Sequence, residues 1–300
     1  MAQPLLARLR QKEPRIQLDV LAPEWVVPVA RRMPEVDDVI TAPFRHGALH
    51  LGRRWRLGRA LKGRYAQAIV LPNSWKAALV PFFAHIPVRR GYVGESRYGL
   101  LNLRYRSASV PMREHYAQLA DAPGTAPAPL LQPRLRADAA QVAATRARFG
   151  LKDAYVALCP GAEYGPAKRW PYFGELAARL EKPVVLLGSP NDAGAAAGIA
   201  GTNLVGRTTL DEAIDLIAGA ERVVTNDSGL MHVAAALGRP LVALFGSSSP
   251  QKTPPQAGRS RVLWLKPECS PCYERECPLG HFRCMREISV DMVLTELARL

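Results

Sequence analysis

The sequence lacks any apolar run long enough to span a membrane, and its first residues do not resemble a secretory signal. It also lacks a helix-turn-helix signature and any basic motif rich in aromatic residues. Nothing beyond charge therefore favours nucleic-acid binding, and we expect no nucleic-acid partner. We expect a soluble cytosolic protein rather than a secreted or membrane-spanning one.

Acidic residues are outnumbered, since 26 Asp and Glu stand against 40 Lys and Arg and give a formal net charge of +14. Such an excess indicates an anionic partner, which could be nucleic acid, an acidic membrane surface or a phosphorylated substrate. Composition does not choose among them. The basic residues concentrate in the first half of the chain, where any single arginine is most simply part of a solvated face.

The 300 residues, 48% of them hydrophobic, suit two domains of ordinary size. Short apolar runs ended by Pro, Gly, Asn or Asp alternate with helical patterns at residues 170–181 and 209–220, which predicts parallel sheets covered by helices. The runs are IQLDVLAP, AQAIVLPN, AYVALCPG, PVVLLGSP, ERVVTND and PLVALFGS. Residues 120–138 are rich in proline and small side chains, so we expect a linker there and domains at 1–138 and 139–300.

In the second domain, polar loops follow the predicted strands: PGAEYGPAKRWP, GSPND, GRTT, NDSG and GSSSP. Open α/β sheets bind ligands at the carboxyl ends of their strands, so these five loops could converge on one crevice. A glycine loop with Lys168 and a helix that starts after Asp227 together suit a diphosphate. Taken singly, Asp227 could be only a helix cap, and His232 could be only structural.

The stretch TNDSGLMHVAAALGRPLVALFGSSSP, with PGAEYGPAKRWP upstream and LPNSWKAALVPFFAHIPVRRGY in the first domain, resembles the ADP-heptose glycosyltransferases of glycosyltransferase family 9. The resemblance covers nearly the whole chain. It implies a GT-B fold with two Rossmann-like domains facing a central cleft.

The activity implied by this resemblance is inverting transfer of L-glycero-D-manno-heptose from ADP-L-glycero-D-manno-heptose to heptosyl-Kdo2-lipid A, in the lipopolysaccharide inner core. No cofactor is implied for the transfer. The acceptor is an anionic glycolipid, so we also expect peripheral contact with the cytoplasmic face of the inner membrane.

The same resemblance assigns roles to residues. Lys168 and Asp227 would be catalytic, with Lys168 neutralising the phosphates of the departing ADP, and Asp192 would bind the nucleoside. The full donor set would be Lys168, Asp192, Thr208, Thr209, Asp227, Ser228, Gly229 and His232. The acceptor set would be Arg53, Arg54, Arg56, Arg59, Lys76, Arg89, Arg90 and Arg97.

Members of the family begin with an apolar strand and a glycine loop ending in GD, whose aspartate is the general base. This sequence begins at MAQPLLARLR, within the helix that follows, so we expect the first βα unit and the base to be missing from it. We then expect Leu5, Leu6 and Leu9 to pack imperfectly. Two alternatives remain open: a non-catalytic protein that binds ADP-sugar or lipid A, and another heptosyltransferase of the same family.

Four cysteines lie in CSPCYERECPLGHFRC, at Cys269, Cys272, Cys277 and Cys284, with two, four and six residues between successive members. The first pair suits a structural zinc site, while the later spacings fit no common zinc finger. Free thiols and redox-labile disulfides are the alternatives. The fifth, Cys159, lies in a strand run and is most simply a small core residue.

Overall fold

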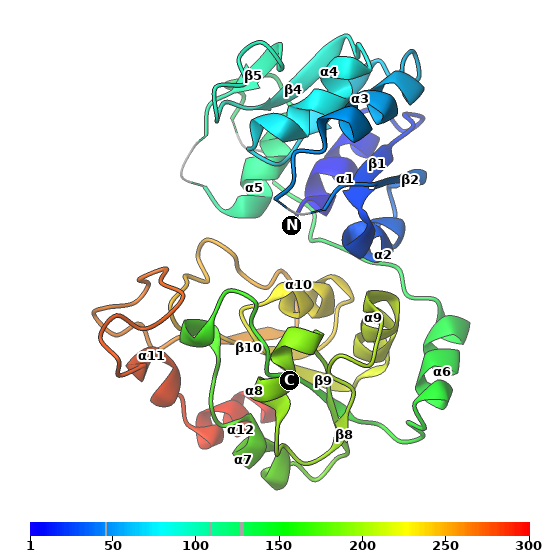
Figure 1. The fold of residues 1–300 in the computed structure, drawn as a ribbon. Helices are drawn as coiled ribbons and strands as arrows, with labels where there is room; N and C mark the ends of the chain where they lie inside the picture. Colours follow the sequence, from blue (N-terminus) through cyan, green and yellow to red (C-terminus); the bar gives the residue numbers. More distant parts are fainter. Residues whose placement is uncertain (46, 108–109, 127–128) are drawn as a thin grey trace. The chain divides into compact units, whose positions relative to one another are not determined.

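The computed structural model describes residues 1–45, 47–107, 110–126 and 129–300, which form two units (Figure 1). Unit 1 is Met1–Arg31 with Glu35–Leu131, and unit 2 is Arg32–Pro34 with Gln132–Leu300. The division after Leu131 falls inside the predicted linker, of which residues 127 and 128 lie outside the described residues. Within the described part of the chain, no helix combines the length and apolarity that crossing a bilayer requires.

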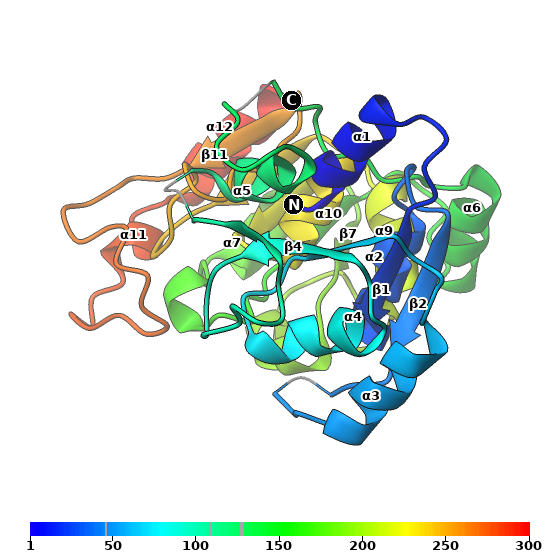
Figure 2. The ribbon, with the colours of Figure 1, turned by 90° about the horizontal axis from the view of Figure 1, so that it is seen from above.

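Unit 1 alternates short strands with short helices. Its elements are α1 (Gln3–Lys12), β1 (Asp19–Pro23), η1 (Glu24–Val26), α2 (Val27–Arg31), β2 (Asp38–Ala42), α3 (Leu51–Ala60), β3 (Gln67–Val70), η2 (Trp75–Ala78), α4 (Leu79–Phe83), β4 (Val88–Tyr92), β5 (Leu103–Tyr105), α5 (Met112–Ala117) and η3 (Gln118–Ala120). Strands β1 and β2 pair in parallel and lie side by side (Figure 2), while β3, β4 and β5 form a second parallel sheet.

Helix α1 contributes to the core of unit 1. Leu5 and Leu9 lie one turn apart on its inner face and pack with Tyr92 and Tyr105, leaving Leu5 only 1% exposed. The expectation of imperfect packing is therefore wrong for Leu5 and Leu9, while Leu6 is half-buried against the same cluster. The two aromatic side chains supply the apolar surface that this face of the helix needs.

Unit 2 contains one six-stranded parallel sheet in the order β11-β10-β9-β6-β7-β8. Its elements are α6 (Ala139–Arg148), β6 (Val156–Cys159), η4 (Pro166–Lys168), α7 (Phe173–Arg179), β7 (Val184–Leu186), η5 (Pro190–Asp192), α8 (Ala193–Ala196), β8 (Thr202–Asn203), α9 (Leu210–Gly219), β9 (Arg222–Asn226), α10 (Gly229–Ala236), β10 (Leu241–Leu244), β11 (Ser260–Leu263), α11 (Arg283–Arg286) and α12 (Val290–Ala298).

The sheet of unit 2 is covered on both faces. Helices α9 and α10 pack together on one face, and α7 and α12 pack together on the other (Figure 1). All four residues of β6 and of β10 are buried, which explains why both strands are apolar throughout instead of alternating with polar residues. The parallel sheets predicted from the apolar runs are confirmed.

The chain order of the strands reverses at the centre of this sheet. From β6 the chain proceeds outward through β7 and β8, then returns to the other side of β6 and proceeds through β9, β10 and β11. Ligands of open α/β sheets bind beyond the carboxyl ends of the strands at such a reversal. The candidate site is therefore built from the loops that follow β6 and β9, at Cys159 and Thr225, which face each other in the ladder.

Candidate functional site

The buried side-chain amide of Asn226, at the end of β9, forms hydrogen bonds to the loop after β6. Asn226 is fully buried; its Nδ2 donates to the carbonyl oxygen of Pro160 at 2.8 Å, and its Oδ1 accepts from the backbone N–H of Trp170 at 3.1 Å. Both ends of the loop at 160–170 are thus fixed to β9. A buried amide satisfied in this way holds the loop in one arrangement.

Three loops meet at the carboxylate of Asp227. Lys168 Nζ, from the loop after β6, lies 2.5 Å from Asp227 Oδ2. The Ser248 hydroxyl, from the loop after β10, donates to the same oxygen at 2.6 Å. Asp227 is buried and the Lys168 side chain is 15% exposed, so little water screens this ion pair.

A tyrosine ring also contacts the lysine. Lys168 Nζ lies 4.8 Å from the centroid of the Tyr164 ring, and the guanidinium carbon of Arg275 lies 5.4 Å from the same centroid. Cations within about 6 Å of an aromatic centroid are attracted to its face. The Tyr164 ring therefore contacts two cations, and one of them, Lys168, is paired with Asp227.

Helix α10 begins beside this ion pair. In the described chain, the Ser228 hydroxyl makes no capping bond to the helix, and it contacts Thr225 Oγ1 at 3.2 Å. Gly229 is exposed, and a Cβ built on it would have no described atom outside the helix turn within 4 Å. The start of α10 therefore carries no side-chain cap from the described residues, and the uncapped N–H groups of a helix start are groups that bind anions.

His232 follows one turn along α10 and is half-buried. Burial lowers the pKa of its imidazole well below the ordinary value. The ring is therefore neutral at pH 7, with one nitrogen able to donate a hydrogen bond and the other able to accept one.

Two glycines let the loop after β6 approach its neighbours. A Cβ on Gly161 would lie 2.1 Å from Cγ of Asp192, and a Cβ on Gly165 would lie 2.4 Å from the carbonyl oxygen of Arg275. Gly165 also has a φ of +146°, which other residues rarely adopt. Both positions therefore require glycine for space, and Gly165 requires it for conformation as well.

Asp192 is buried at the end of the loop after β7. Its Oδ2 accepts hydrogen bonds from the backbone N–H of Ser189 at 2.9 Å and from the Ser189 hydroxyl at 2.7 Å. Its Oδ1 is buried and has no hydrogen-bond partner among the described residues. The next loop adjoins this one, because the N–H of Gly206 donates to the carbonyl oxygen of Gly188 at 3.0 Å.

Thr209 caps helix α9. Its hydroxyl accepts from the N–H of Glu212 at 3.3 Å, and its own N–H donates to the Glu212 carboxylate at 2.8 Å. The sequence placed Thr209 in the donor site, and this geometry gives it a structural role as a helix cap. Thr208 is half-buried immediately before it.

Most of the predicted donor residues are brought together, and some contacts were missed. All five polar loops lie at the carboxyl edge of the sheet, and those after β6 and β9 flank the strand reversal. The sequence assigned no contact in the site to Asn226, Ser248 or Tyr164, although all three lie within loops that it identified. Nothing in the sequence linked Arg275 to the loop that carries Lys168.

Two of the predicted acceptor residues are interior. Arg97 is 1% exposed, and its guanidinium donates to the carbonyl oxygens of Tyr92 and Pro72. Arg54 is also buried; it donates to the carbonyl oxygen of Leu49 at 2.6 Å and lies over the ring of Phe44. These bonds use the guanidinium donors within unit 1, so we remove Arg54 and Arg97 from the acceptor set.

Three further predicted acceptor residues donate side-chain hydrogen bonds to backbone carbonyl oxygens of unit 1. Arg89 donates to the carbonyl oxygens of Leu100 and Ile86, and Arg90 donates to that of Leu119. Lys76 Nζ donates to the carbonyl oxygen of Gly47 at 2.7 Å. All three side chains are half-buried.

The remaining acceptor candidates lie on the outer face of α3. Arg53, Arg56 and Arg59 are exposed there. Leu51 and Trp55 are about half exposed on the same helix, at 50% and 52%. We call Leu51, Arg53, Trp55, Arg56 and Arg59 the α3 surface; it combines positive charge with exposed apolar side chains.

The four clustered cysteines and Cys159 are free thiols. In residues 1–45, 47–107, 110–126 and 129–300, no group of three or more His, Cys, Asp or Glu side chains is placed so that it could hold a metal ion. Cys159 is fully buried in β6 and packs as a core residue, as expected.

Comparison with known proteins identifies the family. Residues 54–283 match the model of glycosyltransferase family 9 (heptosyltransferase). The chain is 44% identical to lipopolysaccharide heptosyltransferase 2 of Escherichia coli (strain K12), in an alignment that covers 100% of this chain and 94% of that protein. This chain belongs to glycosyltransferase family 9.

Other relatives agree with this membership of family 9. The chain is 41% identical to lipooligosaccharide heptosyltransferase 2 of Haemophilus influenzae, with 100% of this chain and 95% of that protein covered. The solved structure of E. coli ADP-heptose LPS heptosyltransferase II superposes with a TM-score of 0.88 at 41% identity, covering 99% of this chain and 93% of that chain. The predicted family and GT-B fold class, with two Rossmann-like units, are confirmed.

Proposed function

We propose that this family 9 glycosyltransferase transfers L-glycero-D-manno-heptose from ADP-L-glycero-D-manno-heptose to heptosyl-Kdo2-lipid A, in the inner core of lipopolysaccharide. One structural observation supports this above the others. The ion pair of Lys168 with Asp227 lies beside the open start of α10, at the strand reversal of unit 2. The relatives named as heptosyltransferase 2 support the choice of substrates.

The diphosphate of the donor binds at the start of α10. The N–H groups at Gly229 and the positive end of the helix dipole favour an anion by about 0.3 to 1 kcal/mol, up to ~2 when partly buried. That is too little for tight binding. Lys168 therefore supplies the main charge, because its ammonium can hold Asp227 and a phosphate oxygen at the same time.

Asp227 acts mainly as a positioning residue in this account. Its Oδ2 accepts from both Lys168 and Ser248, so it holds the ammonium at the helix start before any ligand arrives. Such preorganisation means that little rearrangement is needed as charge develops on the leaving group. Ser228 and His232 contact the donor from the first turn of α10.

The nucleoside lies toward the loops after β7 and β8. Asp192 Oδ1 is the buried oxygen without a partner among the described residues, and a ribose hydroxyl would satisfy it. Thr208 lines the same region. Thr209 contributes indirectly, by capping α9 next to this loop.

In the transfer step, an acceptor hydroxyl attacks the anomeric carbon of heptose from the face opposite to the diphosphate. The new carbon–oxygen bond forms as the bond to ADP breaks, and the hydroxyl proton passes to a general base. Lys168 and the α10 N–H groups stabilise the charge that collects on the departing ADP. No metal enters this step.

The acceptor and the membrane are contacted through the α3 surface. Its three arginines match the phosphates and carboxylates of heptosyl-Kdo2-lipid A, because a guanidinium binds such groups with two parallel hydrogen bonds. Leu51 and Trp55 add apolar contact at the bilayer interface. This arrangement favours peripheral association with the cytoplasmic face of the inner membrane. Lys76, Arg89 and Arg90 would assist only after releasing carbonyl oxygens that they now bind.

Calorimetry tests the donor half of the proposal. We expect ADP-heptose and ADP to bind, and UDP and GDP to bind at least tenfold more weakly, a difference of about 1.4 kcal/mol. Equal affinity for all three nucleotides would contradict the proposed adenosine site. A protein that binds ADP-heptose without turning it over in the presence of acceptor would favour the non-catalytic alternative.

A further inference from the structure

The segment between β11 and α11, residues 264–282, has neither helix nor strand. Leu265 packs against the core of unit 2, but two other large apolar side chains of the segment are exposed, Leu279 at 63% and Tyr273 at 44%. A long irregular segment that buries so little apolar surface needs another source of stability, such as a cross-link or a metal ion.

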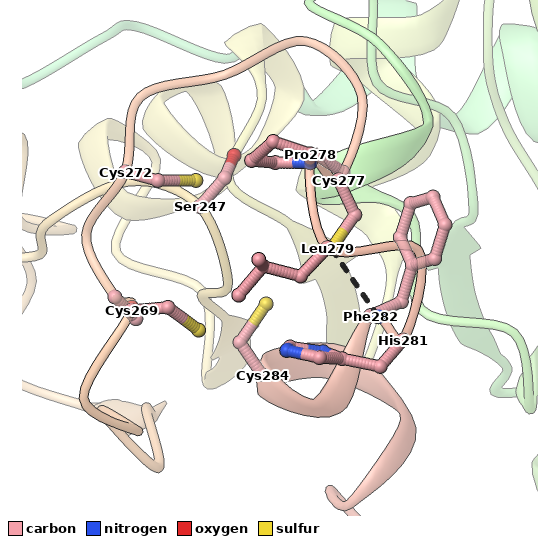
Figure 3. A pocket seen from close by; sticks show the side chains of 11 residues that line it. Ser247, Cys269, Cys272, Cys277, Pro278, Leu279, His281, Phe282 and Cys284 are labelled. Atoms are coloured by element: carbon pink, nitrogen blue, oxygen red, sulfur yellow. Dashed lines mark hydrogen bonds between the residues drawn. The ribbon is translucent and has the colours of Figure 1, made fainter.

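Four thiols from this segment and the helix that follows it line one pocket. Cys269, Cys272, Cys277 and Cys284 line one pocket together with His281, and Figure 3 shows all four sulfur-bearing side chains directed toward its interior. Three come from the irregular segment, and the fourth lies in α11. A small hydrophobic core would not require four cysteines. The fifth cysteine of the chain is Cys159.

The turn that follows Cys277 forms a backbone hydrogen bond to the Cys277 sulfur. The N–H of Phe282 donates to Cys277 Sγ at 3.4 Å, drawn as a dashed line in Figure 3. The N–H of Gly280 donates to the Cys277 carbonyl oxygen at 3.0 Å, and both Gly280 and Phe282 have positive φ. The bond from the Phe282 N–H fixes the orientation of the Cys277 side chain, as hydrogen bonds to ligand atoms do in metal sites.

We propose that Cys269, Cys272, Cys277 and Cys284 bind one Zn²⁺ ion as a tetrahedral four-thiolate site. Four sulfur ligands in tetrahedral geometry are the preference of zinc, with sulfurs about 2.3 Å from the ion. Four thiols lose their protons to solvent as four zinc–sulfur bonds form. The four thiols line one pocket, but among the described residues no group of side chains could hold a metal ion as now placed, so zinc binding requires the thiols to move closer together.

The site would act on the donor loop through backbone contacts. The N–H of Tyr273 donates to the carbonyl oxygen of Ser247 at 2.7 Å, next to Ser248. The carbonyl oxygen of Arg275 accepts from the N–H of Ala167 at 3.1 Å, next to Lys168. Zinc would therefore order the segment whose backbone is hydrogen-bonded to the loops that carry Lys168 and Ser248. This consequence, unlike the metal site itself, rests on the proposed function.

Metal content is the direct test of the site. The chain is expressed in zinc-supplemented medium, purified without chelator under reducing conditions and analysed by elemental mass spectrometry. We expect one zinc per chain in the wild type and in the control Cys159→Ala, and less than a tenth of that in Cys277→Ser/Cys284→Ser. Iron in place of zinc, or no metal after reconstitution with Zn²⁺, would overturn the proposal. An intact chain mass lower by two hydrogens, the sign of a disulfide, would also overturn it.

A second measurement does not depend on the folding of a variant. Metal-stripped wild-type chain is titrated with Co²⁺, and we expect the strong visible absorption of a tetrahedral cobalt–thiolate site, abolished by an equivalent of Zn²⁺. The weak spectrum of octahedral cobalt would contradict the site. Stripping zinc should also weaken ADP binding more than tenfold, reversibly. Zinc binding with unchanged ADP affinity would refute the link to the donor loop, and zinc binding without any ADP binding would refute the proposed function alone.

Discussion

Lys168 Nζ and Asp227 Oδ2 lie 2.5 Å apart, although the two residues belong to loops that follow different strands. The pair exists because β6 and β9 are neighbours at the strand reversal of unit 2. It places a cation beside the start of α10 before any ligand binds.

Replacing either member of the pair should weaken donor binding. We expect Lys168→Ala and Asp227→Asn each to lower ADP affinity more than tenfold, a loss of about 1.4 kcal/mol or more, measured by calorimetry. The double variant should lose less than the sum of the two, because Asp227 acts through Lys168. Lys152→Ala, at an exposed position of unit 2, is the control and should bind normally. Wild-type affinity in both single variants would remove the proposed site.

Gly161 should not tolerate alanine. The added Cβ would meet the Asp192 carboxylate at 2.1 Å, so the loop or Asp192 must move, at a cost of about 1–3 kcal/mol in unfolding free energy. Gly194 is the matched control, since a Cβ there meets nothing within 4 Å and its alanine variant should be neutral or slightly stabilising. Urea unfolding measures both. Equal stability of the two variants would show that the close approach of Gly161 to Asp192 does not matter.

The sequence predicted the unit 2 sheet well because its strands are buried on both faces and so are apolar throughout. It also predicted the loops of the site, since glycine and capping residues mark strand-to-helix turns. It could not predict which polar groups pair across loops. Ser248 donating to Asp227 and Arg275 accepting from Ala167 depend on strand order and on an irregular segment, and neither leaves a local pattern.

The basic residues of unit 1 illustrate the same limit. Charge alone does not separate Arg97, whose guanidinium is used by backbone carbonyls, from Arg56, which is exposed on α3. The distinction arises from burial, which depends on how the strands and helices of unit 1 pack. The sequence therefore indicated an anionic partner. The structure shows which of the basic side chains are exposed and so able to bind it.

The α3 surface should control membrane and acceptor binding. Arg56→Glu/Arg59→Glu should weaken binding to vesicles of anionic lipid more than tenfold and leave ADP affinity unchanged, and binding by the wild type should fall with added salt. Arg15→Glu/Arg106→Glu makes the same change of net charge at exposed positions outside α3 and should have a smaller effect. Vesicle sedimentation measures both. Similar losses in the two variants would mean that only net charge matters.

His115 should make unit 1 sensitive to acid. Its ring is buried and stacks on Tyr92 at 3.7 Å, and burial lowers its pKa below the ordinary value near 6.5. The unfolded chain then binds a proton more readily than the folded chain, so stability is retained above about pH 6.5 and falls as the pH drops below it. His115→Phe should show a shallower loss of stability between pH 7 and 5. Identical pH profiles from urea unfolding would exclude this role.

Heptose transfer itself is the most direct test of the account. Mass spectrometry of the lipid follows addition of one heptose from ADP-heptose to heptosyl-Kdo2-lipid A, with Kdo2-lipid A as the competing acceptor. We predict one heptose added to heptosyl-Kdo2-lipid A, little addition to Kdo2-lipid A, and loss of at least 10²-fold in rate in Lys168→Ala. Faster transfer to Kdo2-lipid A, or an unchanged rate in Lys168→Ala, would contradict the proposed function.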